Sequence, residues 1–303
     1  MRIFQYFFIF FTLVFTTYCQ SSFAKPYYYL YAFGDSLTDN GNLYAMTYYR
    51  KPTPLPNPKE YFYGRFSNGL VWIEYLAPML NLPSNHVMNM AYGGADTGKN
   101  NYNDVKGGAQ YPGLAKEVTL FLQQYRAKKI DNQHALYIIW SGADNFLGKF
   151  TDPEKTAEDA ARGVSDAIIR LHIQAGAQHF MLINIPFLGF TPYVLSLEKN
   201  RPGTAKKFND IVGFTNQFYQ QQAQRLNKKW GIDITYVNTN RIFLDMIHQP
   251  QKYGFTNVNQ SCYALQQQNG CQNPSEFLFW GVVHPSTKTH RIIARWLYDH
   301  YLK

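Results

Sequence analysis

Residues 31–42 read Tyr31-Ala32-Phe33-Gly34-Asp35-Ser36-Leu37-Thr38-Asp39-Asn40-Gly41-Asn42. The apolar, aromatic run that ends at Phe33 predicts a buried strand, and the polar residues after it are suited to begin a helix. Ser36, on the turn between them, would expose its hydroxyl among backbone N–H groups that lack helical partners. Such a turn suits a nucleophile with part of an oxyanion hole beside it. Taken alone, a Gly-Asp-Ser triplet more often marks an ordinary connection in which the serine caps the helix.

The first 24 residues have the three parts of a secretory signal peptide. Arg2 precedes a short apolar run, and Ser22-Phe23-Ala24 ends the segment with a small-x-small pattern. We therefore expect cleavage near Ala24 and a secreted or periplasmic protein. A lipid anchor on Cys19 is the less favoured interpretation, because a bulky tyrosine precedes that cysteine. No later apolar run is long enough to span a bilayer.

The charge and aromatic content of the chain narrow its expected partners. The net charge is +9 at pH 7, or +8 without Arg2, and 17% of the residues are aromatic. Basic aromatic proteins include nucleic-acid binders and proteins of anionic lipid surfaces. The Lys and Arg residues are scattered and no nucleic-acid motif is present, so we expect no nucleic-acid partner. An ordinary exported protein is the favoured interpretation, with a lipid surface second.

Cleavage near Ala24 would leave two cysteines, Cys262 and Cys271. In an exported protein, two cysteines that close a short loop predict a disulfide. In the chain-entropy model a loop of this size is worth about 2–3 kcal/mol of stability. No Cys-x-x-Cys and no closely spaced histidine pair accompanies these cysteines, so we expect no metal site.

Strand patterns and helix patterns alternate along the remaining chain. The five predicted strands are Tyr28–Phe33, Val87–Tyr92, Ala135–Trp140, His179–Ile185 and Ile232–Asn238. The predicted helices are Gly69–Leu80, Glu117–Lys128, Pro153–Ala175, Thr204–Lys229 and Thr287–Leu302. This alternation predicts a parallel sheet covered on both faces. No repeat or linker interrupts it, so we expect one domain over residues 25–303.

Polar residues follow several of the predicted strands. Gly93-Gly94 follows the second strand, residues 141–146 follow the third, and His284 precedes the last helix. The carboxyl ends of parallel strands meet at one edge of a sheet, where α/β domains place their substrate sites. There Ser36 and His284 would supply a nucleophile and a base, with polar donors facing a developing oxyanion.

These blocks resemble the GDSL family of serine esterases and lipases, also called SGNH hydrolases. Gly34–Leu37 is similar to the family's first block, Tyr92–Ala95 to the second and His284–Ser286 to the last; Asn184–Pro192 resembles a further segment that many members carry. The blocks come in the family's order. The segment Phe33–Asn42 is most similar to exported bacterial phospholipases, lysophospholipases and lipid acyltransferases.

The resemblance implies a flavodoxin-like, three-layer α/β/α sandwich around a five-stranded parallel sheet. It implies that Ser36 is the nucleophile and His284 the general base. The backbone N–H groups of Ser36 and Gly94 would be two donors of the oxyanion hole. The resemblance implies no metal and no organic cofactor.

The third block of this chain departs from the family pattern. The family reads Gly-x-Asn-Asp and uses the Asn side chain as an oxyanion donor, whereas this chain reads Gly142-Ala143-Asp144-Asn145. An ionised Asp144 beside an oxyanion would oppose catalysis, so we expect a local backbone adjustment that lets Asn145 supply the amide. The alternative is that Asp144 points away and only two donors remain, at a typical cost of about 3 kcal/mol.

A second departure lies three residues before His284. The family usually has an Asp there, which orients the imidazole and stabilises its charged form, but this chain has Gly281. A backbone carbonyl, a carboxylate such as Glu276, or a bound water or anion such as chloride could replace that Asp. We favour the carbonyl or the anion over Glu276.

The sequence therefore predicts an exported carboxylic ester hydrolase, a lysophospholipase or phospholipase A. It would act as a monomer on lipid at a membrane or micelle surface, through an acyl-enzyme. Transfer of the acyl group to an alcohol would use the same site. The alternatives are an esterase that removes acetyl groups from carbohydrate and a catalytically silent lipid or glycan binder.

The loop closed by Cys262 and Cys271 precedes His284 and is polar. One hypothesis is that it covers the site until an activating protease cuts it. The favoured interpretation is simpler, with the disulfide acting as a staple for a long surface insertion.

Overall fold

The computed structural model describes residues 27–125, 132–148 and 152–303. The predicted signal peptide, residues 1–24, lies outside these ranges. Within them, no helix is both long enough and apolar enough to cross a membrane.

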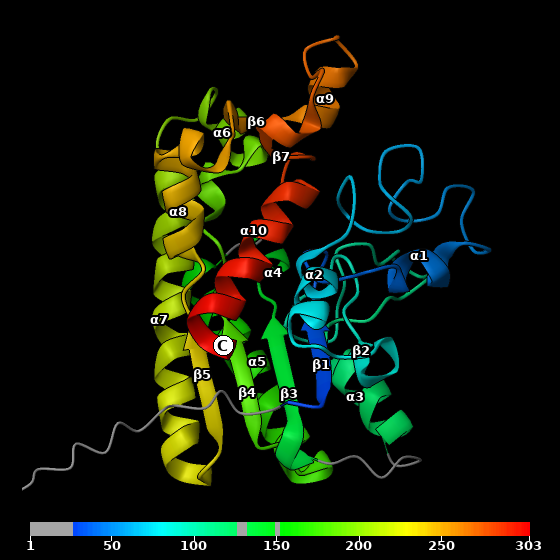
Figure 1. Cartoon of the computed structure of the whole chain (residues 1–303), viewed down its shortest axis with the longest axis vertical. Helices are drawn as coiled ribbons and strands as arrows, with labels where there is room; N and C mark the ends of the chain where they lie inside the picture. Colours follow the sequence, from blue (N-terminus) through cyan, green and yellow to red (C-terminus); the bar gives the residue numbers. More distant parts are fainter. Residues whose placement is uncertain (1–26, 126–131, 149–151) are drawn as a thin grey trace, which may run out of the picture.

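A five-stranded sheet forms the centre of the molecule (Figure 1). Its order is β2-β1-β3-β4-β5, and every neighbouring pair is parallel. The strands are β1 (Tyr29–Gly34), β2 (Val87–Asn89), β3 (Ala135–Trp140), β4 (His179–Ile183) and β5 (Asp233–Val237). Four of these strands lie inside the predicted ranges, and β1 extends one residue beyond its predicted end, to Gly34. Their carboxyl ends therefore meet at one edge of the sheet, as predicted.

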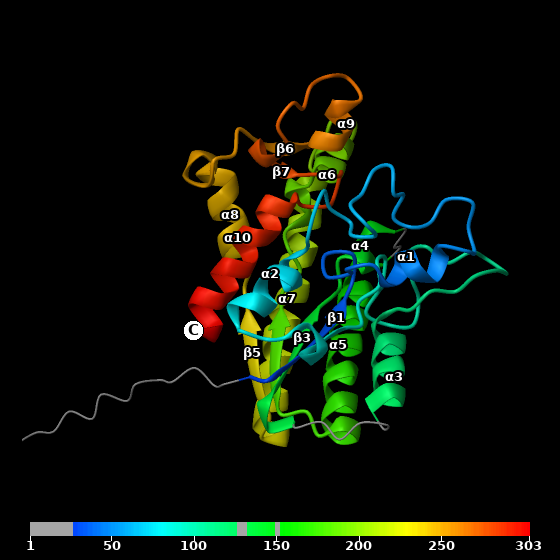
Figure 2. The same cartoon turned by 45° about the vertical axis from the view of Figure 1, so that its right-hand side comes forward.

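Helices cover both faces of the sheet and confirm the predicted three-layer α/β/α sandwich (Figure 2). One face packs on α3 (Leu114–Tyr125), α5 (Pro153–Ala175) and α7 (Thr204–Trp230). The other packs on α2 (Trp72–Met79), α8 (Asn240–His248) and α10 (Thr287–Leu297). Alternate strand residues enter the two cores: Phe33 faces α3, whereas Ala32 faces α2. Burial on both faces explains why these strands read as continuous apolar runs.

Local signals set the bounds of the long helices. The Asp152 side chain accepts a hydrogen bond from the Lys155 N–H at the start of α5, and the helix ends at Gly176, whose φ is +70°. Ser286 caps α10 in the same way through the Thr289 N–H. These are ordinary helix start and stop signals.

Short elements that the periodicity did not predict surround the carboxyl edge. They are α1 (Asn42–Thr47), α4 (Asp144–Leu147), α6 (Pro192–Glu198), β6 (Asn257–Ser261), α9 (Cys262–Gln266) and β7 (Phe277–Phe279). The strands β6 and β7 pair in a separate two-stranded sheet. This small sheet and α9 lie at the end toward which the arrows of the main sheet point (Figure 1).

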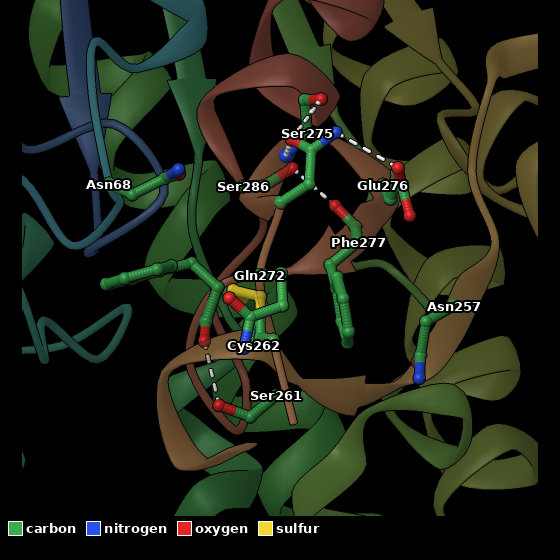
Figure 3. The surroundings of a disulfide bond; sticks show 12 residues. Asn68, Asn257, Ser261, Cys262, Gln272, Ser275, Glu276, Phe277 and Ser286 are labelled. Carbon is green, nitrogen blue, oxygen red and sulfur yellow. Dashed lines mark hydrogen bonds between the residues drawn. A yellow bond between two sulfur atoms is a disulfide. The ribbon is translucent and has the colours of Figure 1, made fainter. Parts of the chain in front are cut away.

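The predicted disulfide joins Cys262 and Cys271, and both residues are buried (Figure 3). The two cysteines form a small apolar cluster with Phe277 and Trp280. The hydroxyl of Ser261, drawn beside the disulfide in Figure 3, donates to the Trp280 carbonyl at 2.8 Å. The disulfide segment is thereby attached to the chain just before His284.

Removal of the disulfide tests how much this segment depends on it. A Cys262→Ala, Cys271→Ala double variant is expected to lose about 2–3 kcal/mol of unfolding free energy, because the unfolded chain regains loop entropy. Urea unfolding followed by tryptophan fluorescence measures this difference. The same protein with the disulfide chemically reduced is the matched control. Equal unfolding midpoints in all three forms would contradict the assignment of a stabilising staple.

Candidate active site

Ser36 lies on the turn that follows β1. The Asp35 carboxylate accepts from the Leu37 N–H at 3.0 Å, and the Asp35 carbonyl accepts from Thr38 and Asp39 N–H groups at 3.0 Å. These bonds close the turn and leave the Ser36 N–H without an acceptor in the described part of the chain. The turn predicted from the Gly-Asp-Ser triplet is therefore present.

The loop after β2 brings a second free amide to the same edge. Gly93 donates to the Asp39 carboxylate at 2.8 Å, whereas the Gly94 N–H has no acceptor among the residues that the structure describes. Gly94 has a φ of +82°, and a Cβ there would lie 2.6 Å from the Asn101 side-chain oxygen. Only glycine fits this position without a shift of its neighbours.

His284 reaches Ser36 from the segment between β7 and α10. Its Nε2 lies 2.9 Å from Ser36 Oγ. The N–H groups of Trp280 and Gly281 both donate to the His284 carbonyl, at 2.9 and 3.1 Å, which fixes the backbone of this turn. Burial lowers the pKa of His284 to about 4. The imidazole is therefore neutral at neutral pH and can accept the serine proton.

The hydroxyl of Tyr61 faces the other nitrogen of the imidazole. It lies 3.4 Å from His284 Nδ1, and a Cβ added at Gly281 would lie 2.8 Å from the same oxygen. Tyr61 thus occupies the space in which a side chain at position 281 would have to lie. Burial raises the pKa of Tyr61 to about 12, so the group is a neutral hydroxyl that can accept the Nδ1 proton.

The sequence did not predict a role for Tyr61, because Tyr61–Tyr63 resembled packing residues. Glu276, the distant carboxylate considered as a partner for His284, has other partners in the structure. It accepts from Asn273 Nδ2 and Thr256 Oγ1 (Figure 3 shows the first of these bonds). A weak signal for Tyr61 existed, since a glycine three residues before the histidine leaves room for a large partner from elsewhere.

Tyr61 is held in place by contacts with the disulfide segment. The Trp280 indole N–H donates to the Glu60 carbonyl at 2.9 Å, and Tyr61 packs against the apolar cluster that includes Trp280 and the two cysteines. None of residues 262–271 lines the cavities beside Ser36. This location favours the staple interpretation of the disulfide loop over a cover for the site.

The third block folds differently from the expectation. Asn145 Oδ1 accepts from the Thr97 N–H at 3.1 Å, and its amide group donates to Thr97 Oγ1 at 3.3 Å. The amide of Asn145 is therefore turned to the loop after β2 and does not reach Ser36. Asp144, in contrast, lines both cavities beside Ser36. The expected backbone adjustment does not occur, because Thr97 supplies both partners that the Asn145 amide needs.

Burial dominates the electrostatics of the carboxyl groups around Ser36. It raises the pKa of Asp35 to about 7 despite the bond from the Leu37 N–H. It also raises the pKa of Asp144 well above its ordinary value, and the neighbouring charges of Asp35 and Asp96 add to this effect. In the described ranges no group of three or more acidic, Cys or His side chains is arranged to hold a metal ion.

Two cavities meet at Ser36, His284 and Asp144. We call the first the apolar cavity; its walls include Phe187, Phe190, Phe243, Leu244 and Ile247. We call the second the Gly94 cavity; its walls include Phe66, Gly94, Tyr102, Tyr193 and Val282. No Lys or Arg lines either cavity among the residues described. The arrangement can therefore hold an apolar group on one side of the serine and an oxyanion on the other.

Substitutions at positions 61 and 281 test the Tyr61 contact. Tyr61→Phe is expected to lower kcat about 5- to 10-fold with little change in KM, because one neutral hydrogen bond to the imidazole is lost. Gly281→Asp alone is expected to be at least as impaired, since its Cβ collides with the Tyr61 hydroxyl. The double variant, in which the blocking oxygen is absent, is expected to exceed both single variants.

Steady-state kinetics on p-nitrophenyl butyrate give kcat and KM for the three variants. Wild-type kcat in Tyr61→Phe, or a double variant no better than Gly281→Asp, would contradict a positioning role for Tyr61. Unchanged unfolding midpoints serve as the control for folding.

Residues 30–297 match the family described as GDSL-like lipase/acylhydrolase. The chain is 31% identical over 278 residues to a thermolabile hemolysin of Vibrio parahaemolyticus, with 87% of this chain and 61% of that protein covered. It is 30% identical over 235 residues to a phosphatidylcholine-sterol acyltransferase of Aeromonas hydrophila, with 77% and 64% covered.

The chain thus spans less than two thirds of the length of these two relatives. It is also 25% identical over 321 residues to a GDSL esterase/lipase of Arabidopsis thaliana, with 90% of this chain and 87% of that protein covered. The chain belongs to the GDSL lipase/acylhydrolase family.

Proposed function

We propose that this protein is an exported ester hydrolase that releases fatty acid from phospholipids or lysophospholipids. Ser36 Oγ attacks the acyl carbonyl while His284 Nε2 takes its proton, and the Ser36 and Gly94 N–H groups bind the oxyanion. The histidine then gives the proton to the leaving alcohol, and an acyl-serine ester remains. Water, deprotonated by His284, releases the fatty acid and restores the serine.

The observation that carries this proposal is the apolar cavity that opens on the Ser36–His284 pair. Aromatic and aliphatic side chains from the segment after β4 and from α8 line it. The cavity encloses about 40 Å³. Its apolar walls would contact the first carbons of an acyl chain, and each methylene that leaves water there gains about 0.8 kcal/mol. The cavity therefore favours lipid esters over acetylated carbohydrate.

Acyl transfer to an alcohol is the second candidate function. One relative is named a phosphatidylcholine-sterol acyltransferase. The Gly94 cavity also opens on Ser36 and His284, so an alcohol bound there could replace water in the second step. Export rests on the signal-peptide pattern of residues 1–24, and we propose that the mature protein begins near Lys25.

Loss of Ser36 tests the hydrolase proposal. Purified mature protein is expected to release fatty acid from long-chain lysophosphatidylcholine, and Ser36→Ala is expected to lose at least about 1,000-fold in rate. Fatty-acid release is measured by titration, with chloride or acetate as the buffer anion. A rate that depends on chloride would support an anion beside His284 and contradict Tyr61 as the partner of the imidazole. Absence of both hydrolysis and fluorophosphonate labelling would favour the silent-binder alternative.

A bulky residue in the apolar cavity tests the acyl-chain assignment. Leu244→Trp is expected to lower kcat/KM for long-chain p-nitrophenyl esters about 10-fold or more, while the acetyl ester changes by less than about 3-fold. Arg241→Trp, on an exposed position of the same helix, is the matched control. Equal losses for short and long esters would contradict the assignment of this cavity to the acyl chain.

A further inference from the structure

Asp144 lines both cavities beside Ser36, and the mechanism above does not use it. It shares the Gly94 cavity with both free amides and also lines the apolar cavity. Its carboxyl group has no hydrogen-bond partner and no ion pair in the described ranges. A carboxyl group placed where an oxyanion forms either repels it, if ionised, or donates to it, if protonated.

The surroundings of Asp144 decide between these two forms. Asp144 is half-buried. An ionised carboxylate in such a place is stabilised by donors or a cation, and Asp144 has neither within the described ranges. Asp35 Oδ1 accepts from the Leu37 N–H, which favours the ionised form of Asp35, whereas Asp144 has no such donor in the described part of the chain. Asp35 Oδ2 is buried without a partner among the described residues, so Asp35 is the competing site for a shared proton. The titratable side chains around Asp144 are Asp35, Asp96, Tyr102, Tyr193, Tyr219 and His284.

We propose that Asp144 acts as a neutral carboxylic acid and donates a hydrogen bond to the oxyanion formed by attack of Ser36. This inference rests on the proposed function, because the oxyanion forms only if Ser36 is the nucleophile. The proton stays on Asp144 throughout the cycle, while the transferred proton moves between Ser36, His284 and the leaving group. The exchange of Asn and Asp in the third block then preserves a donor at this position.

This role has a consequence for the pH dependence of the reaction. The active form needs a neutral His284 and a protonated Asp144. The pKa of His284 is lowered by burial to about 4, and that of Asp144 is raised by burial and by Asp35 and Asp96. The rate therefore rises as pH increases through the pKa of His284 and falls as pH increases further through the pKa of Asp144.

Labelling of Ser36 by a fluorophosphonate tests the donor without reliance on a lipid substrate. The serine oxygen forms a bond to phosphorus, fluoride leaves, and negative charge builds on the phosphoryl oxygen in the oxyanion hole. The second-order rate constant is measured from acidic to alkaline pH in wild type, Asp144→Asn and Asp144→Ala. Circular dichroism and the unfolding midpoint check that each variant is folded.

Wild-type labelling is expected to fall at alkaline pH with a one-proton slope. Asp144→Asn should match wild type at acidic pH and lack this fall, because an amide donates at every pH; it should exceed wild type about 10-fold one unit above the Asp144 pKa. Asp144→Ala should be slower than Asp144→Asn by about 100-fold at all pH values.

Asp35→Asn provides a second, opposite test. Its amide oxygen can still accept from the Leu37 N–H, but the charge that favours protonation of Asp144 is gone. The alkaline fall should therefore move to lower pH. An alkaline fall in Asp144→Asn equal to that of wild type, or wild-type rates in Asp144→Ala, would overturn the proposal.

The outcomes also separate this inference from the proposed function. Labelling with the expected profiles, but without release of fatty acid from lysophospholipid, would contradict the lipid substrate and leave the role of Asp144 supported. Absence of labelling at every pH would overturn both, because Ser36 would not be a nucleophile.

Discussion

Two buried carboxylates, Asp39 and Glu117, hold together the loops on which the site depends. Asp39 accepts from four backbone N–H groups. Three belong to Gly41, Asn42 and Leu43, before α1 and at its start, and the fourth belongs to Gly93. Glu117, on α3, accepts from the N–H groups of Gly34 and Tyr92 at 2.9 and 3.1 Å. A buried backbone N–H group needs a hydrogen-bond acceptor. These two carboxylates accept from N–H groups of the loops around the site. Among the described residues, the amides of Ser36 and Gly94 have no acceptor and are open to a ligand.

The histidine side of the site depends on contacts between distant parts of the chain. Tyr61 and His284 are 223 positions apart, and Tyr61 is held in place through Glu60, Trp280 and the disulfide cluster. Gly281 and Tyr61 form a complementary pair, since the absent side chain of one makes room for the hydroxyl of the other. A neutral phenol in this place orients the imidazole without a negative charge beside it.

One physical cause, burial, shifts the titrating groups around Ser36 toward their neutral forms. It lowers the pKa of His284 and raises those of Tyr61, Asp35 and Asp144. No described Lys or Arg lines the cavities to oppose this effect. Charge then appears in the site when the serine attacks, in surroundings where fixed hydrogen-bond donors act with little screening by water.

The sequence by itself determined the order of strands and helices, because apolar runs and helical periodicity reflect burial that is local in the chain. It also placed Ser36 and Gly94 at one edge, since the ends of the parallel strands before them converge there. His284 follows β7, which lies outside the main sheet, and was placed by the family resemblance. The folded chain alone shows that Asn145 turns to Thr97, that Asp144 lines the cavities beside Ser36 and that Tyr61 reaches His284. These outcomes depend on which distant hydrogen-bond partner lies within reach of a side chain, and no local pattern records that distance.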